Sequence, residues 1–174
     1  MCGSRQIRIY SRTGPWLNEL VNLVLVEPEI PPNTGNVARL CAATRTTLHL
    51  IEPFGFKLDD AALKRAGMDY WQQVTWRRWS NWNAFVAGLP PVGRLWFVES
   101  DGPKRYDEVV FLPNDYLVFG RETAGLPKAL LEQNRETWLR IPMFNPESRS
   151  LNLSNCAALV LFEALRQQGF AGEV

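Results

Sequence analysis

Hydrophobic and polar positions alternate along the chain in blocks whose lengths predict strands and helices in turn. An apolar, β-rich run at residues 21–26 is followed by a Pro-, Gly- and Asn-rich loop at 27–36 and a helix-compatible segment at 37–44. Residues 47–51 again have the pattern of a strand. A strand, a helix and a strand within about 30 residues predict a βαβ unit, in which the two strands pair in parallel.

The alternation continues to the C-terminus. It predicts helices at residues 59–66, 82–89 and 127–134, and strands at residues 73–76, 94–99, 115–120 and 138–143. Such a series predicts an α/β fold with a mostly parallel sheet flanked by helices. We find no internal repeat and no linker, and therefore expect a single domain at residues 20–174. Residues 1–19 are polar and rich in arginine, and we interpret them as an N-terminal extension, favouring a solvated tail over an RNA-touching arm.

The most informative stretch is at residues 139–166, where an apolar strand leads into a polar loop and then into a helix. The loop, residues 145–155, is rich in Ser and Asn, and either Asn152 or Ser154 is expected to cap the helix. Residues 156–162 are all apolar, so the helix has no polar face there, and Gly169 is expected to end it. A membrane span needs about 20 apolar residues. The cover must therefore be the protein core or a second subunit.

Composition narrows the class of protein. The 174 residues are 46% hydrophobic and 21% charged, which is ordinary for a globular domain. The net charge of +1 gives no global argument for or against a nucleic-acid partner. The three cysteines are far apart and match neither a disulfide framework nor a zinc site, so a reducing cytoplasm is expected. Because no signal-peptide core or membrane-length run is found, we expect no membrane anchor.

Three polar loops follow three of the predicted strands. They are PPNTGNVAR at residues 31–39, FGRETAGLP at 119–127, and a longer one at 141–155. Each loop taken alone is a strand-to-helix turn. The carboxyl ends of parallel strands meet at one edge of a sheet, where α/β proteins bind their ligands. Together, the three loops predict a ligand site at that edge.

Several common sites are absent from the sequence. It has no G-x-G-x-x-G dinucleotide fingerprint, no phosphate-binding P-loop and no G-x-S-x-G elbow. His49, the single histidine, lies within a predicted strand, so we interpret it as a packed or surface residue rather than a catalytic one, and Cys41 as a core residue. The segment WRRWSNW at residues 76–82 could stack RNA bases, but we favour ordinary tryptophan packing with arginines that extend to solvent.

The three loops carry a family resemblance. Residues 33–39 match N-x-G-N-x-x-R, residues 119–127 match F-G-x-E-x-x-G-L-P, and residues 141–155 contain I-P-M followed by S-x-N-L-S-N. The chain thereby resembles the SPOUT superfamily of knotted RNA methyltransferases. It is most similar to the small enzymes that methylate the ribose 2′-oxygen of the tRNA wobble nucleotide. The segments EPEIPPNTGN, LHLIEPFGF and RAGMDYW are also close to that group, and the likeness covers Leu20 to about Gly172.

The resemblance implies a deep C-terminal trefoil knot that binds S-adenosylmethionine without a metal. It also implies a homodimer formed through the first and last helices. The implied substrate is the wobble nucleotide of a tRNA anticodon loop, a cytidine or modified uridine at position 34. By position, the implied cofactor-binding residues are Val98, Gly120, Ile141, Ser150 and Leu151.

In the implied reaction, the ribose 2′-hydroxyl attacks the methyl carbon of a sulfonium. Arg39 matches the family arginine often assigned as the base. A guanidinium stays protonated, so we expect Arg39 to hold the adjoining phosphate and favour ionisation of the hydroxyl electrostatically. The implied substrate-binding residues are Asn36, Glu122, Ser154 and Asn155. Two alternatives remain open: a methyltransferase of the same fold that acts on another tRNA or rRNA site, and a catalytically silent RNA-binding dimer.

Overall fold

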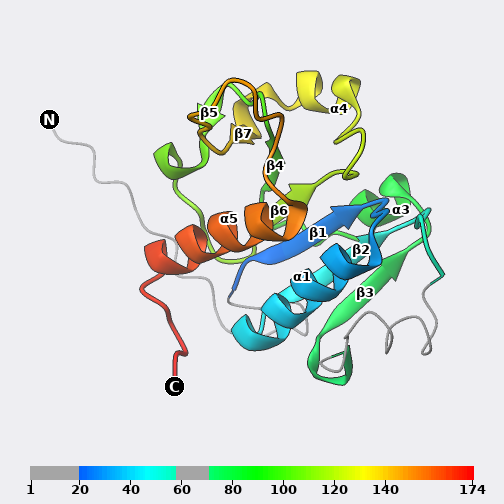
Figure 1. The fold of residues 1–174 in the computed structure, drawn as a ribbon. Coiled ribbons are helices and arrows are strands. Elements are labelled where there is room, and N and C mark those ends of the chain that lie inside the picture. Colours follow the sequence, from blue (N-terminus) through cyan, green and yellow to red (C-terminus); the bar gives the residue numbers. More distant parts are fainter. Residues whose placement is uncertain (1–19, 58–70) are drawn as a thin grey trace, which may run out of the picture.

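The computed structural model describes residues 20–57 and 71–174, which form one sheet with helices on both faces (Figure 1). The sheet has seven strands in the order β3-β2-β1-β6-β4-β7-β5, and all neighbouring pairs are parallel. The strands are β1 (Asn22–Val26), β2 (Thr47–Ile51), β3 (Trp76–Trp79), β4 (Leu95–Glu99), β5 (Lys104–Arg105), β6 (Tyr116–Phe119) and β7 (Trp138–Arg140). The helices are α1 (Pro31–Thr44), α3 (Trp82–Ala87), α4 (Lys128–Gln133) and α5 (Leu153–Gln167), with 3₁₀ turns at Trp71–Gln73, Tyr106–Glu108 and Arg135–Thr137.

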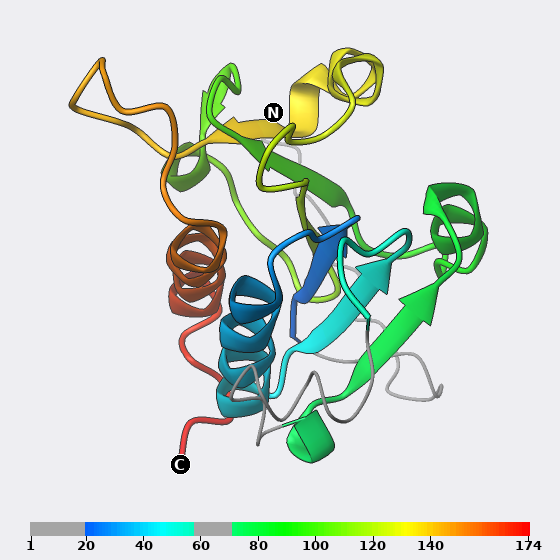
Figure 2. The same ribbon diagram turned by 45° about the vertical axis from the view of Figure 1, so that its right-hand side comes forward.

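Alternating side chains of the strands build two separate cores. From β1, Leu23 and Leu25 point into a core shared with α1 and α5, whereas Val24 and Val26 point into a core shared with α3 and α4. Both faces of the strand are therefore buried, which explains its continuous apolar run. On the first face α1 and α5 lie side by side, as the two views show (Figures 1 and 2).

The predicted α/β architecture, a parallel sheet flanked by helices, is confirmed for the described residues. β1, α1 and β2 form the expected βαβ unit, and β1 pairs with β2 in parallel. Asn152 is the N-cap of α5, with its side-chain oxygen accepting a hydrogen bond from the Ser154 N–H at 2.9 Å. Gly169 follows the end of α5 with a φ of +67°, the left-handed conformation that glycine adopts readily.

The first predicted loop was wrong in its extent. We expected the helix to begin at residue 37, but α1 begins at Pro31, so the PPNTGN segment forms its first turns. Two prolines suit this position because the first N–H groups of a helix have no partner within the helix. Asn33, Thr34 and Gly35 are buried there. The sequence reads as a turn because the group that caps this helix comes from a distant segment.

Other boundaries also shifted. The strand expected at residues 73–76 is β3 at Trp76–Trp79, because the preceding residues form a 3₁₀ turn. The strand expected at 138–143 ends at Arg140, shortly before Pro142, and α5 begins at Leu153, inside the expected loop. The helices expected at 82–89 and 127–134 are shorter, at Trp82–Ala87 and Lys128–Gln133. β5 was not anticipated, and the helix expected at 59–66 lies outside the described residues.

The apolar segment of α5 is covered on one side by its own chain. Ala157, Val160 and Leu161 are fully buried, whereas Leu159 and Phe162 are 43% and 48% exposed. Among residues 20–57 and 71–174, nothing covers this remaining apolar stripe of α5. No helix within residues 20–57 and 71–174 has the length and apolarity needed to cross a membrane.

Candidate functional site

The candidate site lies where the order of strands in the sheet reverses. From β1 the chain proceeds outward to β2 and β3, whereas β6 and β4 lie on the other side of β1. In open parallel sheets the crevice at such a switch point, outside the carboxyl ends of the strands, is the usual ligand site. The segments that follow β1 and β6 meet there, as predicted for the first two loops.

Glu122, in the segment after β6, caps the start of α1. Its carboxylate accepts hydrogen bonds from the backbone N–H groups of Glu29 at 2.8 Å and Ile30 at 3.2 Å, and from the Asn33 side-chain amide at 3.0 Å. The N-cap residue itself, Ile30, has no side-chain acceptor. A carboxylate at a helix N-terminus satisfies unpaired donors and interacts favourably with the helix dipole.

The same two segments are joined in the reverse direction. The Glu29 carboxylate accepts hydrogen bonds from the Thr123 N–H at 3.0 Å and the Thr123 hydroxyl at 2.7 Å. Arg121 forms an ion pair with Glu27. The segment before α1 and the segment after β6 are thus held together by reciprocal side-chain contacts across about 90 residues of sequence.

The third loop joins this network through two asparagines. The Asn152 side-chain amide donates to the Asn33 side-chain oxygen at 2.9 Å, and the Asn152 oxygen accepts from the Ser154 hydroxyl at 2.7 Å. Asn33 also donates to Glu122. A continuous chain of hydrogen bonds therefore connects the starts of α1 and α5 to the segment after β6, and the three predicted loops are brought together.

A second group of contacts lies between the end of β4 and the segment after β6. The Glu99 carboxylate accepts from the Leu126 N–H at 2.7 Å. A Cβ atom at Gly125, which has a φ of +65°, would lie 2.6 Å from the same carboxylate. A Cβ atom at Gly120 would lie 2.2 Å from the Gly125 carbonyl carbon. Gly120 requires glycine because the backbone of Gly125 lies directly against it, and Gly125 favours glycine because its φ is positive.

Burial governs the electrostatics of this region. Burial raises the pKa of the Glu99 carboxyl above its ordinary value, although the hydrogen bond from Leu126 acts in the opposite direction. Burial, and then the charge of Glu99, raise the pKa of the Cys156 thiol to about 11. Cys156 is therefore protonated at neutral pH and is not a nucleophile.

The predicted cofactor residues fall into a buried group and an exposed group. Val98 pairs in register with Phe119 and Leu139 on the neighbouring strands, so Val98, Gly120 and Ile141 stand together at one edge of the sheet. All three are buried.

Ser150 and Leu151 are exposed, on the loop that leads to α5. Apolar walls beside loop backbone suit a flat heterocycle, and the partly buried carboxylate of Glu99 beside Gly125 suits a cation when it is ionised. These residues therefore fit a cofactor of the kind that the resemblance implies.

The predicted substrate residues lie on the helix starts. Asn36 and Arg39 are exposed and three residues apart on α1, so their side chains share one face of the helix. Ser154 and Asn155 lie in the first turn of α5, with Asn155 exposed. Glu122 is half-buried against α1 and is occupied as a helix cap. The capping role of Glu122 was not anticipated.

The residues interpreted as structural are confirmed as such. Cys41 is 1% exposed, and burial raises its pKa. His49 is 4% exposed, with Nε2 3.3 Å from the Asn22 side-chain oxygen and Nδ1 accepting from the Trp79 indole N–H at 3.1 Å. Burial, and then the charge of Arg77, lower the pKa of His49 to about 3.

The tryptophans at either end of WRRWSNW pack against other aromatic rings, Trp76 on Trp71 and Trp82 on Phe85. In residues 20–57 and 71–174, no cluster of three His, Cys, Asp or Glu side chains is arranged to hold a metal ion.

Sequence reasoning missed Glu29, Glu99 and the bridging role of Asn33. Glu29 lies two residues before the Pro-Pro pair that opens α1, and Glu99 is the last residue of an apolar strand. An acidic residue at the end of a buried strand is a usable signal, because its carboxylate must find a partner. The partner itself cannot be read from the sequence.

Comparison with known proteins is consistent across sequence and structure. A family model described as the SpoU rRNA Methylase family matches residues 20–162. A protein of Saccharophagus degradans named tRNA (cytidine(34)-2'-O)-methyltransferase is 54% identical over 156 residues, which cover 88% of this chain and 99% of the relative.

Solved structures share the fold. One, described as giving structural insights into the 2-OH methylation of C/U34 on tRNA, aligns with a TM-score of 0.81 and 43% identity, covering 87% of this chain and 98% of the other. The SpoU methyltransferase AviRb of Streptomyces viridochromogenes, in complex with the cofactor AdoMet, aligns with a TM-score of 0.74 and 23% identity, over 90% of this chain and 64% of the other. At that identity the second likeness concerns the fold alone.

Proposed function

The chain belongs to the SpoU rRNA methylase family, and from that membership we propose that it is a tRNA methyltransferase. The methyl group is transferred from S-adenosylmethionine to the ribose 2′-oxygen of the wobble nucleotide, position 34. The observation that carries the proposal is the 54% identity to a tRNA (cytidine(34)-2'-O)-methyltransferase that the chain covers almost completely. The joined loops after β1 and β6 and before α5 support it, because they assemble one polar edge from three distant segments.

The cofactor is proposed to lie at the ends of β4, β6 and β7, in a trefoil knot. Val98 and Ile141 would hold the adenine ring between apolar walls, and Gly120, Ser150 and Leu151 would contact it through backbone groups. A knot is supported by the position of β7, which is inserted between β4 and β5. The connection between those two strands crosses close to β7, since a Cβ atom at Gly102 would lie 2.2 Å from the Leu139 carbonyl carbon.

When bound, S-adenosylmethionine supplies a methyl carbon attached to a sulfonium, an excellent leaving group. In the proposed transfer the 2′-oxygen would form a bond to that carbon as the carbon–sulfur bond breaks, and the hydroxyl proton would pass to solvent. Little covalent chemistry is required of the protein, so accurate positioning of the hydroxyl provides most of the rate.

Arg39 is proposed to act on the substrate side. Its guanidinium, on the exposed face of α1, would hold the phosphate beside the target ribose and stabilise the developing charge on the 2′-oxygen. Asn36, Ser154 and Asn155 would orient the ribose. The network from Glu122 through Asn33 to Asn152 fixes the starts of α1 and α5, and therefore the spacing between these groups.

The proposed assembly is a homodimer in the cytoplasm, in which residues 20–174 form a single methyltransferase domain after the extension at 1–19. The exposed apolar stripe of α5, which includes Leu159 and Phe162, supports an interface through α5 and the adjacent α1. An unpartnered apolar stripe beside a second helix is the kind of surface that homodimers bury.

Direct methylation of tRNA tests the proposal. Purified protein is incubated with labelled S-adenosylmethionine and unmodified tRNA transcripts, and the label is mapped by nuclease digestion. We expect label in the ribose at position 34. Label in a base or at another ribose would indicate a methyltransferase of the same fold with a different site. Binding of RNA without label in any transcript would indicate the silent RNA-binding dimer.

A further inference from the structure

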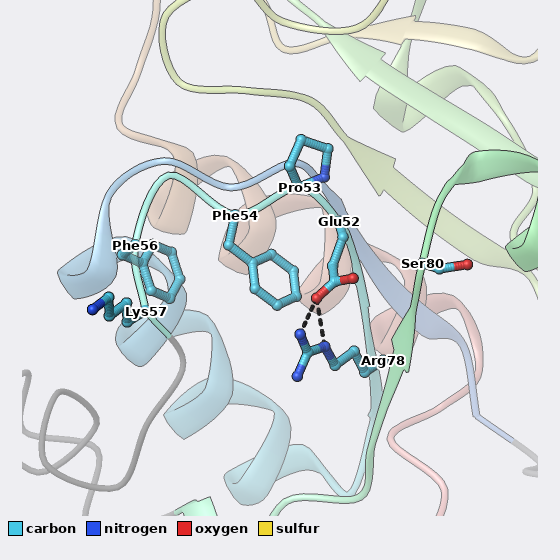
Figure 3. Close-up of a pocket in the computed structure, with 7 residues that line it drawn as sticks. All are labelled: Glu52, Pro53, Phe54, Phe56, Lys57, Arg78 and Ser80. Atoms are coloured by element: carbon cyan, nitrogen blue, oxygen red, sulfur yellow. Dashed lines mark hydrogen bonds and ion pairs between the residues drawn. The ribbon is translucent and has the colours of Figure 1, made fainter.

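A pocket of about 550 Å³ opens beside the ends of β2 and β3, outside the site described above (Figure 3). Its walls combine aromatic rings, cations, one carboxylate and one hydroxyl. They include Glu52, Phe54, Phe56, Lys57, Arg78 and Ser80. Because all strands of the sheet are parallel, this pocket opens at the same edge as the loops after β1 and β6.

Arg78 and Phe54 form the aromatic and cationic wall. The Arg78 guanidinium lies 5.6 Å from the centroid of the Phe54 ring, and its Nε donates to the Glu52 carboxylate at 2.6 Å. Phe54 in turn stacks on Phe56, with ring centroids 5.9 Å apart and an angle of 18° between planes. The ion pair with Glu52 holds the guanidinium over the ring, as Figure 3 shows.

The pocket is rigidly joined to the candidate active site. The Gly55 N–H, between the two phenylalanines, donates to the Pro28 carbonyl at 3.0 Å. A Cβ atom at Gly55 would lie 2.8 Å from the Glu29 Cα, so the two segments are in direct backbone contact. Glu29 belongs to the segment that leads into α1, and its backbone N–H donates a hydrogen bond to the Glu122 carboxylate. The pocket therefore has a fixed position relative to α1, the helix that carries Arg39.

On the basis of the proposed function, we propose that this pocket binds one unpaired nucleotide of the tRNA strand next to the methylated one. Its base stacks on the wall formed by Phe54 and Arg78, and its phosphate meets the exposed Lys57 amine. Single-stranded RNA is held in this manner elsewhere, by bases on aromatic rings or guanidinium planes and by cations along the backbone. Arg78 is 56% exposed, so the stacking surface is accessible to solvent.

A second subsite of this kind meets a need of the proposed reaction. Arg39 is proposed to hold the phosphate beside the target ribose, which leaves the adjoining strand some freedom to rotate. Holding a neighbouring base at a fixed position removes that freedom and orients the 2′-hydroxyl. A net charge of +1 also provides little general attraction for RNA, so affinity must come from local sites such as this one.

The test combines variants of the pocket with abasic RNA. We would measure binding of an anticodon stem-loop by fluorescence anisotropy and methylation of the same RNA, for wild type, Phe54→Leu and Arg78→Gln. We expect each variant to raise the Kd for RNA about tenfold and to lower kcat/KM for methylation by at least that factor, with the affinity for S-adenosylmethionine unchanged. The control is Arg105→Gln, which removes another exposed, ion-paired arginine from β5, at the opposite edge of the sheet.

Abasic RNAs identify the nucleotide. Each loop position next to the target is replaced in turn by an abasic residue. At one position the abasic residue should reduce the affinity of wild-type protein for RNA as much as Phe54→Leu does. With that abasic RNA, Phe54→Leu should then cause no further loss of affinity. Unchanged RNA affinity in both variants, or the same loss from Phe54→Leu on every abasic RNA, would overturn the proposal. Because binding is measured separately, wild-type protein that binds the RNA but does not label position 34 would contradict the proposed function and not the pocket.

Discussion

Asn152 and Asn33 lie 119 residues apart in the sequence, and the side-chain amide of Asn152 donates to the side-chain oxygen of Asn33 at 2.9 Å. Asn152 caps α5, and Asn33 lies in the first turn of α1, beside the cap provided by Glu122. One hydrogen bond thus joins the starts of the two helices that carry the proposed substrate residues.

This bond leads to a first prediction, on stability. Asn152→Ala removes both the cap of α5 and the bond to Asn33, so we expect a loss of about 2 kcal/mol in the free energy of unfolding, from about 1 kcal/mol for each contact. Urea denaturation would measure it. Asn155→Ala is the matched control, since Asn155 is exposed in the same first turn. Equal stabilities of the two variants would contradict the linking role of Asn152.

The second prediction separates two roles of Glu122. Glu122→Ala leaves the Glu29 and Ile30 N–H groups without their acceptor, and should cost about 1–3 kcal/mol of stability. Glu122→Gln keeps an acceptor oxygen and should lose less. If Glu122→Gln is as stable as wild type but methylates RNA about 100-fold more slowly, the carboxylate acts on the ribose as well as on the helix.

The third prediction concerns Arg39. Arg39→Ala should lower kcat for methyl transfer by about 100-fold or more while leaving affinity for S-adenosylmethionine near wild type, because the proposed cofactor residues lie on other segments. Arg39→Lys keeps the charge but loses the two-pronged geometry, and should also be strongly impaired. Calorimetry with the cofactor and single-turnover methylation provide the two measurements. Wild-type activity in Arg39→Ala would exclude Arg39 from the mechanism.

The fourth prediction is a pH dependence of stability that originates at His49. Its pKa is about 3 in the folded protein and about 6.5 when unfolded, so the unfolded state binds an additional proton between these values. The contribution of His49 to stability is therefore complete above pH 6.5 and falls as the pH decreases towards 3. From pH 6.5 to pH 5 we expect a loss of about 2 kcal/mol.

Denaturation of His49→Gln over the same pH range is the comparison for that prediction. A glutamine does not titrate, so the difference between variant and wild type should shrink as the pH falls. A difference that stays constant from pH 7 to pH 5 would show that His49 does not change its protonation on unfolding.

The fifth prediction concerns the dimer. Leu159 is 43% exposed within one chain, so Leu159→Asp should leave the fold of the subunit intact while placing a charge in the proposed interface. Light scattering should show a dimer for wild type and a monomer for the variant. Ala157→Asp provides the contrast, because Ala157 is fully buried and its replacement should unfold the chain. A wild-type protein that is monomeric at high concentration would show that the proposed interface does not form.

Much of the fold could be predicted from local pattern alone. Buried strands such as β1 and β2 are continuous apolar runs, and their alternation with helices indicates a parallel sheet, because parallel strands need a crossover. Cys41 could be interpreted as a core residue, and His49 as a structural residue either packed or at the surface, because neither has a chemical partner nearby in the sequence. These features depend on interactions between residues that are close in the sequence. Composition and the spacing of apolar positions therefore reveal them directly.

The start of α1 and the contacts of the site depended on the tertiary structure. PPNTGN reads as a turn, and it becomes helical because Glu122, from a segment about 90 residues later, provides the acceptor that the helix start lacks. Other contacts also join residues that are far apart in the sequence. They are those of Asn33 with Asn152, Glu99 with Leu126, and Gly55 with Glu29. The sequence alone determined which residue types stand at the ends of the strands. Their partners were decided only when the parallel sheet brought those ends to one edge, because a hydrogen bond acts over about 3 Å whatever the separation along the chain.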